Sequence, residues 1–457
     1  MLVACGVGYG LLGLPVQVTD SFGNLVQVSS EPSLTGLVYK QFYQTAFLRP
    51  FLWGQIRLVY GLADGHYYAW FRGLHVAQVA ALVVLFVRLV RVRRGVELAA
   101  VPLGLAALVG IHTFTGTVDE AFPINTFLTV LLCCYAAADL ALGEPAWWRD
   151  VSAALLFVFA ALTVESGLLV AVIVVTARLA GARGVSWYGA GFQAALVAAY
   201  FVLRIGVLHI GSPGLDERSS GFGFAMREPS ELIAMFGGSP LPFYAYNVAS
   251  SLLSVLFSEP RAGLWRVTRS LVAGEPGVAG LVNVVSSTLG TLLIAGYAWS
   301  RRRDWRARRL THDDRLVVLG AVVALANAAI SFAYTKDVIL SPAGGFYALA
   351  LTVAVRQALE RASHGTVVRA AGTGLVLLAL SCGWTFRAAG TQVRLRHSAE
   401  TKYVEWAYVD RWLEEQELVL STPEALAIKR QLRADAIWNH PVRPPLAGDW
   451  LEWFEDE

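Results

Sequence analysis

The sequence predicts an all-α protein, a polytopic integral membrane bundle of about eleven transmembrane helices. Of its 457 residues, 56% are apolar and only 16% are charged, against roughly 25% charged residues in an average soluble domain. The mean hydropathy is +0.52, and the apolar residues gather in long runs. A water-soluble chain of this size cannot bury so much apolar surface. Disordered, nucleic-acid-binding and disulfide-stapled secreted proteins are therefore excluded.

Eleven apolar segments set the expected number of spans. A bilayer core of ~30 Å takes ~20 apolar helical residues, and fewer where a helix is broken or re-entrant. The first segment is short for a span and lacks the basic start of a signal peptide. The fifth and sixth are separated by Glu165-Ser166-Gly167, which predicts two half-helices that meet at a polar tip. The segments lie at about 2–14, 68–90, 97–114, 122–142, 152–163, 167–182, 187–208, 279–299, 316–334, 340–358 and 367–386.

Arginine-rich loops predict the orientation of the bundle, because basic loops stay on the cytoplasmic side. They follow the second, fourth, sixth, eighth and tenth segments, so all of them fall on one side when the segments are counted in order. The N-terminus is then cytoplasmic, and two long loops, at about 15–67 and 209–278, are extracytoplasmic. The high content of Ala, Gly and Arg favours a bacterial inner (plasma) membrane.

Two further regions follow from this topology. The last 71 residues hold 22 of the 71 charged residues, which predicts a transmembrane domain at 1–386 and a charged extracytoplasmic tail at 387–457. The tail's pattern around 400–418 is helical. The apolar run at 241–257 would invert the basic 301–309 loop if it crossed the membrane. We therefore expect an amphipathic helix on the membrane surface; a re-entrant pair with 264–274 preserves the sidedness equally.

Three ionisable residues on the outer side have both a structural and a functional interpretation. Asp20 is either a turn residue or a carboxylate at the membrane boundary that takes a proton from a substrate. Arg49, which precedes Pro50, either extends to the lipid headgroups or binds a phosphate with its planar set of donors. Glu165 lies among apolar residues, where an ionisable group is a functional hypothesis, or it caps the second half-helix.

Other candidates lie on the remaining outer loops. His112, Asp119 and Glu120 have no spacing typical of a metal site, so solvated loop charges are the simpler interpretation and no metal is predicted. Arg204 is near the outer end of the seventh segment. Lys336 forms a salt bridge with its neighbour or captures a phosphate. The chain has no GxxxxGK[ST], GxSxG or HExxH motif, which argues against ATP-driven transport and against the hydrolases with those motifs.

Four of these places resemble motifs of the GT-C superfamily of membrane glycosyltransferases, which take a sugar from a polyprenyl phosphate. Within it, the similarity is to the transmembrane O-mannosyltransferases with tetratricopeptide repeats, although repeats are missing here. An acid after the first helix is Asp20, and an Arg-Pro pair begins a run that ends at His75. An (S/T)-x-Glu-x-Gly element matches 163–167. The family's Glu-Arg-x-Leu-Tyr-x-Pro-Ser-x-Gly-Phe element lines up with 336–346. Lys336-Asp337 stands there in place of the family's Glu-Arg, so Lys336 would have to substitute for the phosphate-binding arginine.

The resemblance implies an inverting glycosyltransferase whose site faces the extracytoplasmic side. Asp20 would deprotonate the acceptor hydroxyl, and the helix at 241–257 would hold the prenyl chain or control its entry. The groups that would bind the donor phosphate are Arg49, Arg204 and Lys336. The residues that would order the site or bind sugar are Glu165, His75, His112 and Glu120.

The expected partners are a polyprenyl-phosphate-linked sugar, an acceptor of unknown kind and membrane lipids, with no cofactor and no nucleic acid. Two alternatives remain open. The first is a transporter of a lipid-linked glycan or a small solute, whose polar residues would reach both faces of the membrane. The second is a catalytically inactive scaffold of envelope assembly, because Asp20 stands without the second acid common in the family.

Overall fold

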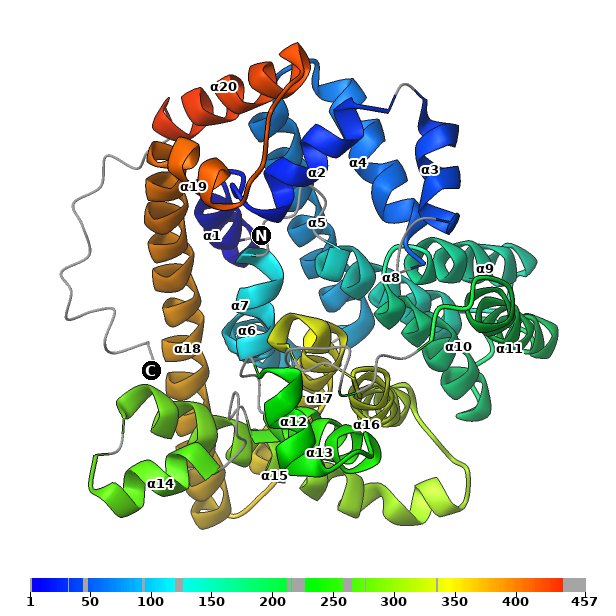
Figure 1. The fold of residues 1–457 in the computed structure, drawn as a ribbon. Helices are drawn as coiled ribbons and strands as arrows, with labels where there is room; N and C mark the ends of the chain where they lie inside the picture. The colour runs from blue at the N-terminus through cyan, green and yellow to red at the C-terminus, as the bar shows by residue number, and fades with distance from the viewer. Residues whose placement is uncertain are drawn as a thin grey trace.

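The computed structural model describes residues 2–31, 33–43, 48–92, 95–119, 126–211, 215, 227–257, 265–275, 277–333 and 336–438. Every regular element in these ranges is a helix (Figure 1). The first half contains α1 (Leu2–Leu11), α2 (Asp20–Ser29), α3 (Leu34–Tyr43), α4 (Pro50–Ala63), α5 (Tyr67–Val90), α6 (Gly95–Gly110), α7 (His112–Asp119), α8 (Thr126–Leu142), α9 (Trp147–Ala161), the 3₁₀ turn η1 (Glu165–Leu168), α10 (Leu169–Leu179), α11 (Trp187–Phe201) and the π-helix η2 (Val202–Val207).

The second half begins with three helices, α12 to α14, which precede the 29-residue helix α15. It consists of α12 (Pro229–Phe236), α13 (Leu241–Phe257), α14 (Trp265–Ala273), α15 (Val278–Arg306), α16 (His312–Ile330), the 3₁₀ turn η3 (Asp337–Leu340), α17 (Ser341–Ser363), α18 (Val367–Ala407), α19 (Val409–Glu415) and α20 (Pro423–Trp438).

Five helices in the described residues are long and apolar enough to cross a membrane: α5, α11 with η2, α15, η3 with α17, and α18. A sixth results if α6 and α7, which are bent by 63°, form one span. These helices are consistent with an integral membrane protein. Each of the eleven predicted segments is at least partly helical, but the expected count of about eleven spans is not confirmed. Helices such as α9 and α10 have only 15 and 11 residues, too few to cross a bilayer alone.

The predicted basic loops meet at one end of the bundle, which we call the basic end. It contains the C-terminal ends of α5, α8, α10, α15 and α17. The Arg91 guanidinium donates to the carbonyl of Leu142, and the Arg315 guanidinium donates to the carbonyl of Ala180. Arg356 pairs with Asp313 and also donates to the backbone of α5. The arginines thus donate hydrogen bonds to the free carbonyls at the C-terminal ends of neighbouring helices. Their positive charge also stabilises the negative end of each helix dipole.

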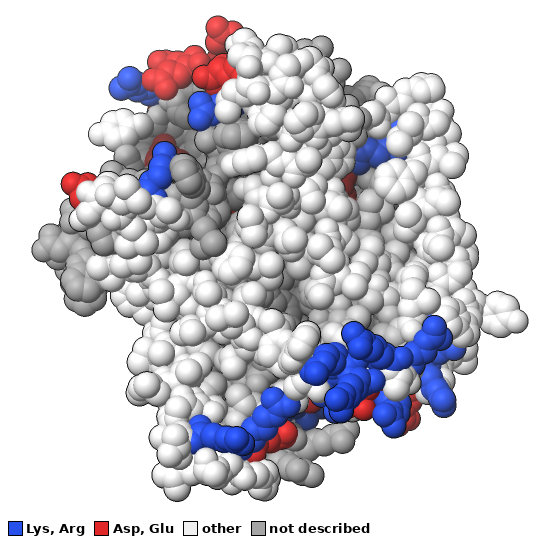
Figure 2. Space-filling model, turned by 90° about the horizontal axis from the view of Figure 1, so that it is seen from below, with Lys and Arg blue, Asp and Glu red and all other residues white. Residues whose placement is uncertain are grey.

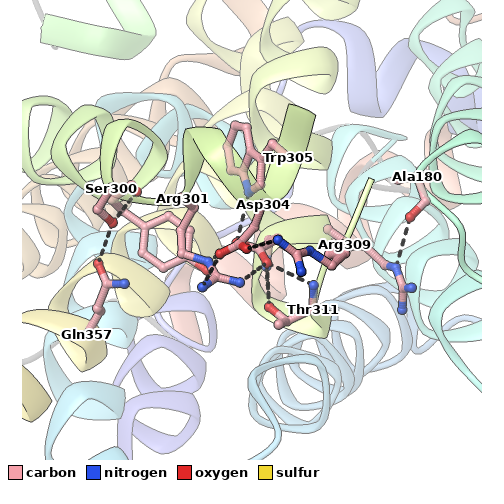
Figure 3. Close-up of polar contacts among 11 residues, drawn as sticks. Ala180, Ser300, Arg301, Asp304, Trp305, Arg309, Thr311 and Gln357 are labelled. Atoms are coloured by element: carbon pink, nitrogen blue, oxygen red, sulfur yellow. Dashed lines mark hydrogen bonds and ion pairs between the residues drawn. The ribbon is translucent and has the colours of Figure 1, made fainter. Parts of the chain in front are cut away.

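Asp314 fixes the turn between α15 and α16 at the basic end. Figure 3 shows Arg301, Trp305 and Thr311, which surround it, and the polar contacts of this turn. Asp314 is fully buried, and its carboxylate accepts hydrogen bonds from the side chains of Tyr297, Arg301 and Trp305 at 2.9–3.1 Å. The backbone N–H and hydroxyl of Thr311 donate to it at 2.8 Å. Burial alone would raise the pKa of Asp314, but these hydrogen bonds outweigh burial and hold the pKa well below its ordinary value.

Charge is unevenly distributed over the molecular surface (Figure 2). Lys and Arg gather in a band along one edge of this view, with a few acidic residues between them. Beside the band lies a wide zone with few charged side chains, and a smaller group of charges follows at the opposite edge. Two charged edges with a largely uncharged zone between them are the pattern expected of a protein surrounded by a bilayer.

The predicted boundary between residues 386 and 387 falls inside α18, a continuous helix of 41 residues. Figure 1 shows α18 (orange) along one side of the molecule, with α19 and α20 at its C-terminal end near α2. Trp406, Leu413 and Ile428 are buried in one apolar cluster with Phe22 and Leu25. The helical pattern expected around 400–418 is confirmed by the end of α18 and by α19.

The apolar run at 241–257 forms α13, as expected, but its polar side faces inward. Asn247, Ser250, Ser251 and Ser254 occupy one stripe of the helix and are buried, while Leu241 is 71% exposed. A helix on the membrane surface would direct that stripe to water. Here the Asn247 amide donates to the carbonyl of residue 332, because α13 packs against α15 and α16.

Candidate functional site

The predicted break at Glu165-Ser166-Gly167 is confirmed, and it carries the central residue of the candidate site, Glu165. Helix α9 ends at Ala161, η1 begins at Glu165 and α10 follows directly. A Cβ atom on Gly167 would lie 2.1 Å from the carbonyl carbon of Ala160. Only glycine therefore allows the chain to turn this closely under the end of α9, which gives the glycine of the predicted (S/T)-x-Glu-x-Gly element a steric role.

The start of α4 rests on this break. The N–H of Phe51 donates to the carbonyl of Leu162 at 3.0 Å, and the Gln55 amide donates to the Thr163 hydroxyl at 3.0 Å. Pro50 occupies the first turn of α4, where its missing N–H costs no helical hydrogen bond. Helix α4, which the Arg-Pro pair begins, thus contacts the element at 163–167 directly, although Gln55 and Thr163 are 108 residues apart in the chain.

Two arginines share the carboxylate of Glu165. The Nε and Nη2 atoms of Arg49 donate to Oε2 at 3.2 and 2.7 Å. Arg204 Nη1 lies 3.5 Å from Oε1. The three side chains are between 18% and 31% exposed, so an anion from outside can reach them. Because α9 and α11 both begin at the basic end, this cluster lies at the opposite end of the bundle.

Arg204 reaches the cluster from η2, a π-helical turn that continues α11. Such turns are rare and occur frequently at functional sites. The Nη1 atom of Arg204 also donates to the Tyr200 hydroxyl at 3.2 Å. Within the described residues, its Nε and Nη2 atoms have no acceptor. Since a guanidinium carries five N–H groups, Arg204 keeps donors for a ligand.

Glu165 is an organising anion in this arrangement. Burial alone would raise its pKa, but the charge and hydrogen bonds of Arg49, together with the charge of Arg204, hold the pKa of Glu165 below its ordinary value. A carboxylate that stays ionised at neutral pH is a poor general acid. The ionised Glu165 carboxylate instead holds the guanidinium groups of Arg49 and Arg204 side by side.

Asp20 and His75 lie on other elements. Asp20 is the exposed first residue of α2, and within the described part of the chain its carboxylate forms no hydrogen bond or ion pair. The loop before it is fixed, because the buried guanidinium of Arg72 donates to the carbonyls of Leu14 and Pro15 at 2.7 and 2.6 Å. His75 Nδ1 lies 3.1 Å from Arg72, so it supports that arginine from inside α5.

His112 belongs to a second polar group. Its Nε2 atom is 2.8 Å from the Ser254 hydroxyl and 3.7 Å from Asp337 Oδ1. In a Ser-His-Asp relay, one ring nitrogen of the histidine contacts the serine and the other contacts the aspartate. Here the same nitrogen, Nε2, faces both residues, so this group does not have the geometry of a relay. Lys336 is exposed at the start of η3, and Glu120 lies outside the described residues.

Two buried cations, Arg387 and Lys402, lie in the C-terminal half of α18. Nothing in the sequence indicated their burial, apart from their position after an apolar run. Arg387 donates to the Gly110 carbonyl and the Ser287 hydroxyl at 3.0 and 2.7 Å. It lines a cavity of about 20 Å³, which has room for a water molecule only. Lys402 pairs with Asp119 at 2.6 Å, which ties α18 to α7. Both cations have structural contacts, and neither extends the arginine cluster.

No group of three His, Cys, Asp or Glu side chains that could hold a metal ion occurs in the described ranges. The chain matches no protein-family model, no curated protein and no solved structure. The arrangement that stands out chemically is therefore the cluster of Arg49, Glu165 and Arg204, which can bind an anion.

Proposed function

We propose that this chain is an inverting glycosyltransferase of the GT-C type, which moves a sugar from a polyprenyl phosphate to an acceptor hydroxyl. The observation that supports the proposal is the pair of guanidinium groups that Glu165 holds at the helix break. It lies at the end of the bundle opposite the basic end, where the phosphate of a lipid-linked donor would meet it. A guanidinium binds phosphate oxygens in a fixed, bidentate geometry.

In this proposal the donor phosphate accepts hydrogen bonds from the remaining N–H groups of Arg204, beside Arg49. As the bond between the anomeric carbon and the phosphate oxygen breaks, its electron pair stays on the phosphate. The guanidinium groups are already fixed by Glu165, so they stabilise the growing negative charge without reorganising. Lys336 would add a further positive charge from η3.

Asp20 is the proposed general base. Its carboxylate would take the proton of the acceptor hydroxyl, and the resulting oxygen would attack the anomeric carbon from the face opposite the phosphate. The products are an inverted glycoside and a free polyprenyl phosphate. The exposure of Asp20 suits this role, because a base must reach an acceptor that arrives from water.

The test is sugar release from a panel of radiolabelled polyprenyl-phosphate sugars, using the full chain in detergent with added lipid. We expect turnover with at least one donor, its loss in Asp20→Asn, and a reduced rate in Arg204→Gln. Arg88→Gln is the matched control, because Arg88 is 62% exposed at the basic end. All variants must elute as the wild-type chain does.

The other outcomes separate the alternatives. Turnover that survives in Asp20→Asn retains the transferase and rejects Asp20 as its base. Equal loss in Arg204→Gln and Arg88→Gln rejects the phosphate site proposed here. Saturable donor binding without turnover rejects the enzyme and favours the transporter or the inactive scaffold.

A further inference from the structure

One face of α15 points away from the bundle and carries exposed apolar side chains at every seventh residue. Val278, Val285, Leu292 and Trp299 are between 53% and 69% exposed. At a rise of 1.5 Å per residue the stripe is about 32 Å long, which matches the thickness of a bilayer's hydrocarbon core. Tryptophan is enriched where that core meets the headgroups. This geometry places Trp299 at the boundary of the membrane.

Six arginines follow Trp299 at 301–309. Arg303, Arg306 and Arg308 are exposed, and within the described ranges their side chains form no hydrogen bond or ion pair. By contrast, Arg301 in the same turn is neutralised by Asp304 and Asp314. Along the helix, Arg303 and Arg306 lie about 6 and 10 Å beyond Trp299, so their long side chains can reach the headgroup layer next to the hydrocarbon core.

The turn presents these side chains from a fixed backbone. Arg306 is the last residue of α15, and Arg308 adopts a left-handed conformation with φ of 54°. The N–H of Arg309 donates to the carbonyl of Asp304 at 2.9 Å. The Asp314 carboxylate accepts hydrogen bonds from Arg301 of α15 and from Thr311, which precedes α16, and so joins the two helices. A ligand that binds here therefore orders side chains only, and binding does not require the backbone to fold.

The same chemistry recurs around the basic end. Three guanidinium groups lie over indole rings that are themselves 46–69% exposed. The pairs are Arg149 over Trp148 at 4.9 Å, Arg178 over Trp187 at 4.6 Å and Arg302 over Trp299 at 4.2 Å. Such amphipathic pairs suit the layer between hydrocarbon and water, so several helices reach the same boundary at this end.

We propose that the turn between α15 and α16 binds the headgroups of anionic phospholipids through Arg303, Arg306 and Arg308. The apolar stripe leads directly into these arginines, which favours a lipid over an acidic soluble partner, because only a lipid fits both parts. The site lies at the end of the bundle opposite the arginine cluster around Glu165. It goes beyond sugar transfer and does not depend on it.

The test is lipid titration of the full chain in detergent, followed by native mass spectrometry. Phosphatidylglycerol should bind more tightly than phosphatidylcholine. Each arginine near a charged membrane surface contributes roughly a five-fold gain, so Arg303→Gln/Arg306→Gln/Arg308→Gln should weaken phosphatidylglycerol binding about a hundred-fold. Replacement of the same three residues by lysine should retain most of the preference. The matched control removes three tail arginines, the exposed Arg411 and Arg430 and the half-buried Arg433, by Arg411→Gln/Arg430→Gln/Arg433→Gln, and should not change the lipid preference.

Several results would overturn the inference. One is equal binding of the two lipids by the wild-type chain, and another is an unchanged preference in the triple glutamine variant. Displacement of the lipid by inorganic phosphate at equal concentration would show a simple anion site. Tighter binding of poly-glutamate than of phosphatidylglycerol would show an acidic-protein site. If the triple variant does not elute as a folded species, the single change Arg306→Gln replaces it as the test. It should weaken phosphatidylglycerol binding about five-fold, and unchanged binding would overturn the inference.

Discussion

The buried carboxylate of Asp314 offers the most direct test of how the basic end is held together. The change Asp314→Asn keeps the shape of the side chain but removes its charge and one acceptor oxygen. The new amide would place its own N–H groups against donors of Tyr297, Trp305 and Arg301, which now point at the carboxylate. The turn between α15 and α16 would lose its central acceptor.

The magnitude follows from these contacts. Removal of one partner from a buried ion pair costs about 3–5 kcal/mol, and each hydrogen bond to a charged group contributes about 1.5–3 kcal/mol without being additive. Arg301 is 27% exposed, so water compensates part of its loss. We expect Asp314→Asn to lower the free energy of unfolding by about 2–4 kcal/mol.

The effect also depends on pH in a defined direction. The pKa of Asp314 is held below its ordinary value in the folded chain, so the folded state binds this proton less readily than the unfolded state does. Its contribution is fully present above the unfolded pKa of about 3.9. It is lost as the pH falls below that value toward the folded pKa. Wild type and Asp314→Asn should therefore converge in stability in strong acid.

The assay is unfolding of the purified chain in detergent, followed by tryptophan fluorescence at neutral and acidic pH. Asp304→Asn is the control, because Asp304 is 33% exposed and such surface pairs contribute about 0–1 kcal/mol. A loss in Asp314→Asn no larger than in Asp304→Asn at neutral pH would refute the reasoning. A difference from wild type that persists in strong acid would refute the assigned ionisation.

Three further predictions concern the rest of the fold. Gly167→Ala should cost about 1–3 kcal/mol or more in unfolding free energy, because its Cβ would meet the backbone of α9. Gly23→Ala is the control: Gly23 lies inside α2 with open space around it, so the change should be neutral or stabilise by up to about 1 kcal/mol in the same unfolding assay. Asp119→Asn should destabilise the chain by about 2–3 kcal/mol by leaving Lys402 buried without its anion, and a combined Asp119→Asn/Lys402→Met variant should recover part of that loss if the pair is the cause. Trp406→Phe should cost about 1 kcal/mol, since its indole N–H donates to the Val16 carbonyl; an unchanged unfolding midpoint would show that this hydrogen bond does not secure the loop before Asp20.

Local patterns in the sequence were enough to predict several features. The apolar runs predicted helices in the right places, and Glu165-Ser166-Gly167 predicted the break that η1 forms. The arginine-rich loops were expected on one side, and the structure brings them to one end of the bundle. These features depend on interactions between residues that are close in sequence or on simple partition between lipid and water, so composition and spacing record them. The number of spans depends on helix length and packing, and it could not be read from apolar runs alone.

Only the tertiary structure decided which polar groups meet. Arg49, Glu165 and Arg204 come from three separate elements, and their contact depends on how α4 and η2 pack on the end of α9. The sequence marked each of them singly but carried no signal for the π-helical turn that aims Arg204. It also carried no signal that α18 continues unbroken past residue 386, and it left Asp314 unnoticed. The physical reason is that a buried charge is stable only with its partners, and partners distant in sequence are brought together only by the folded chain.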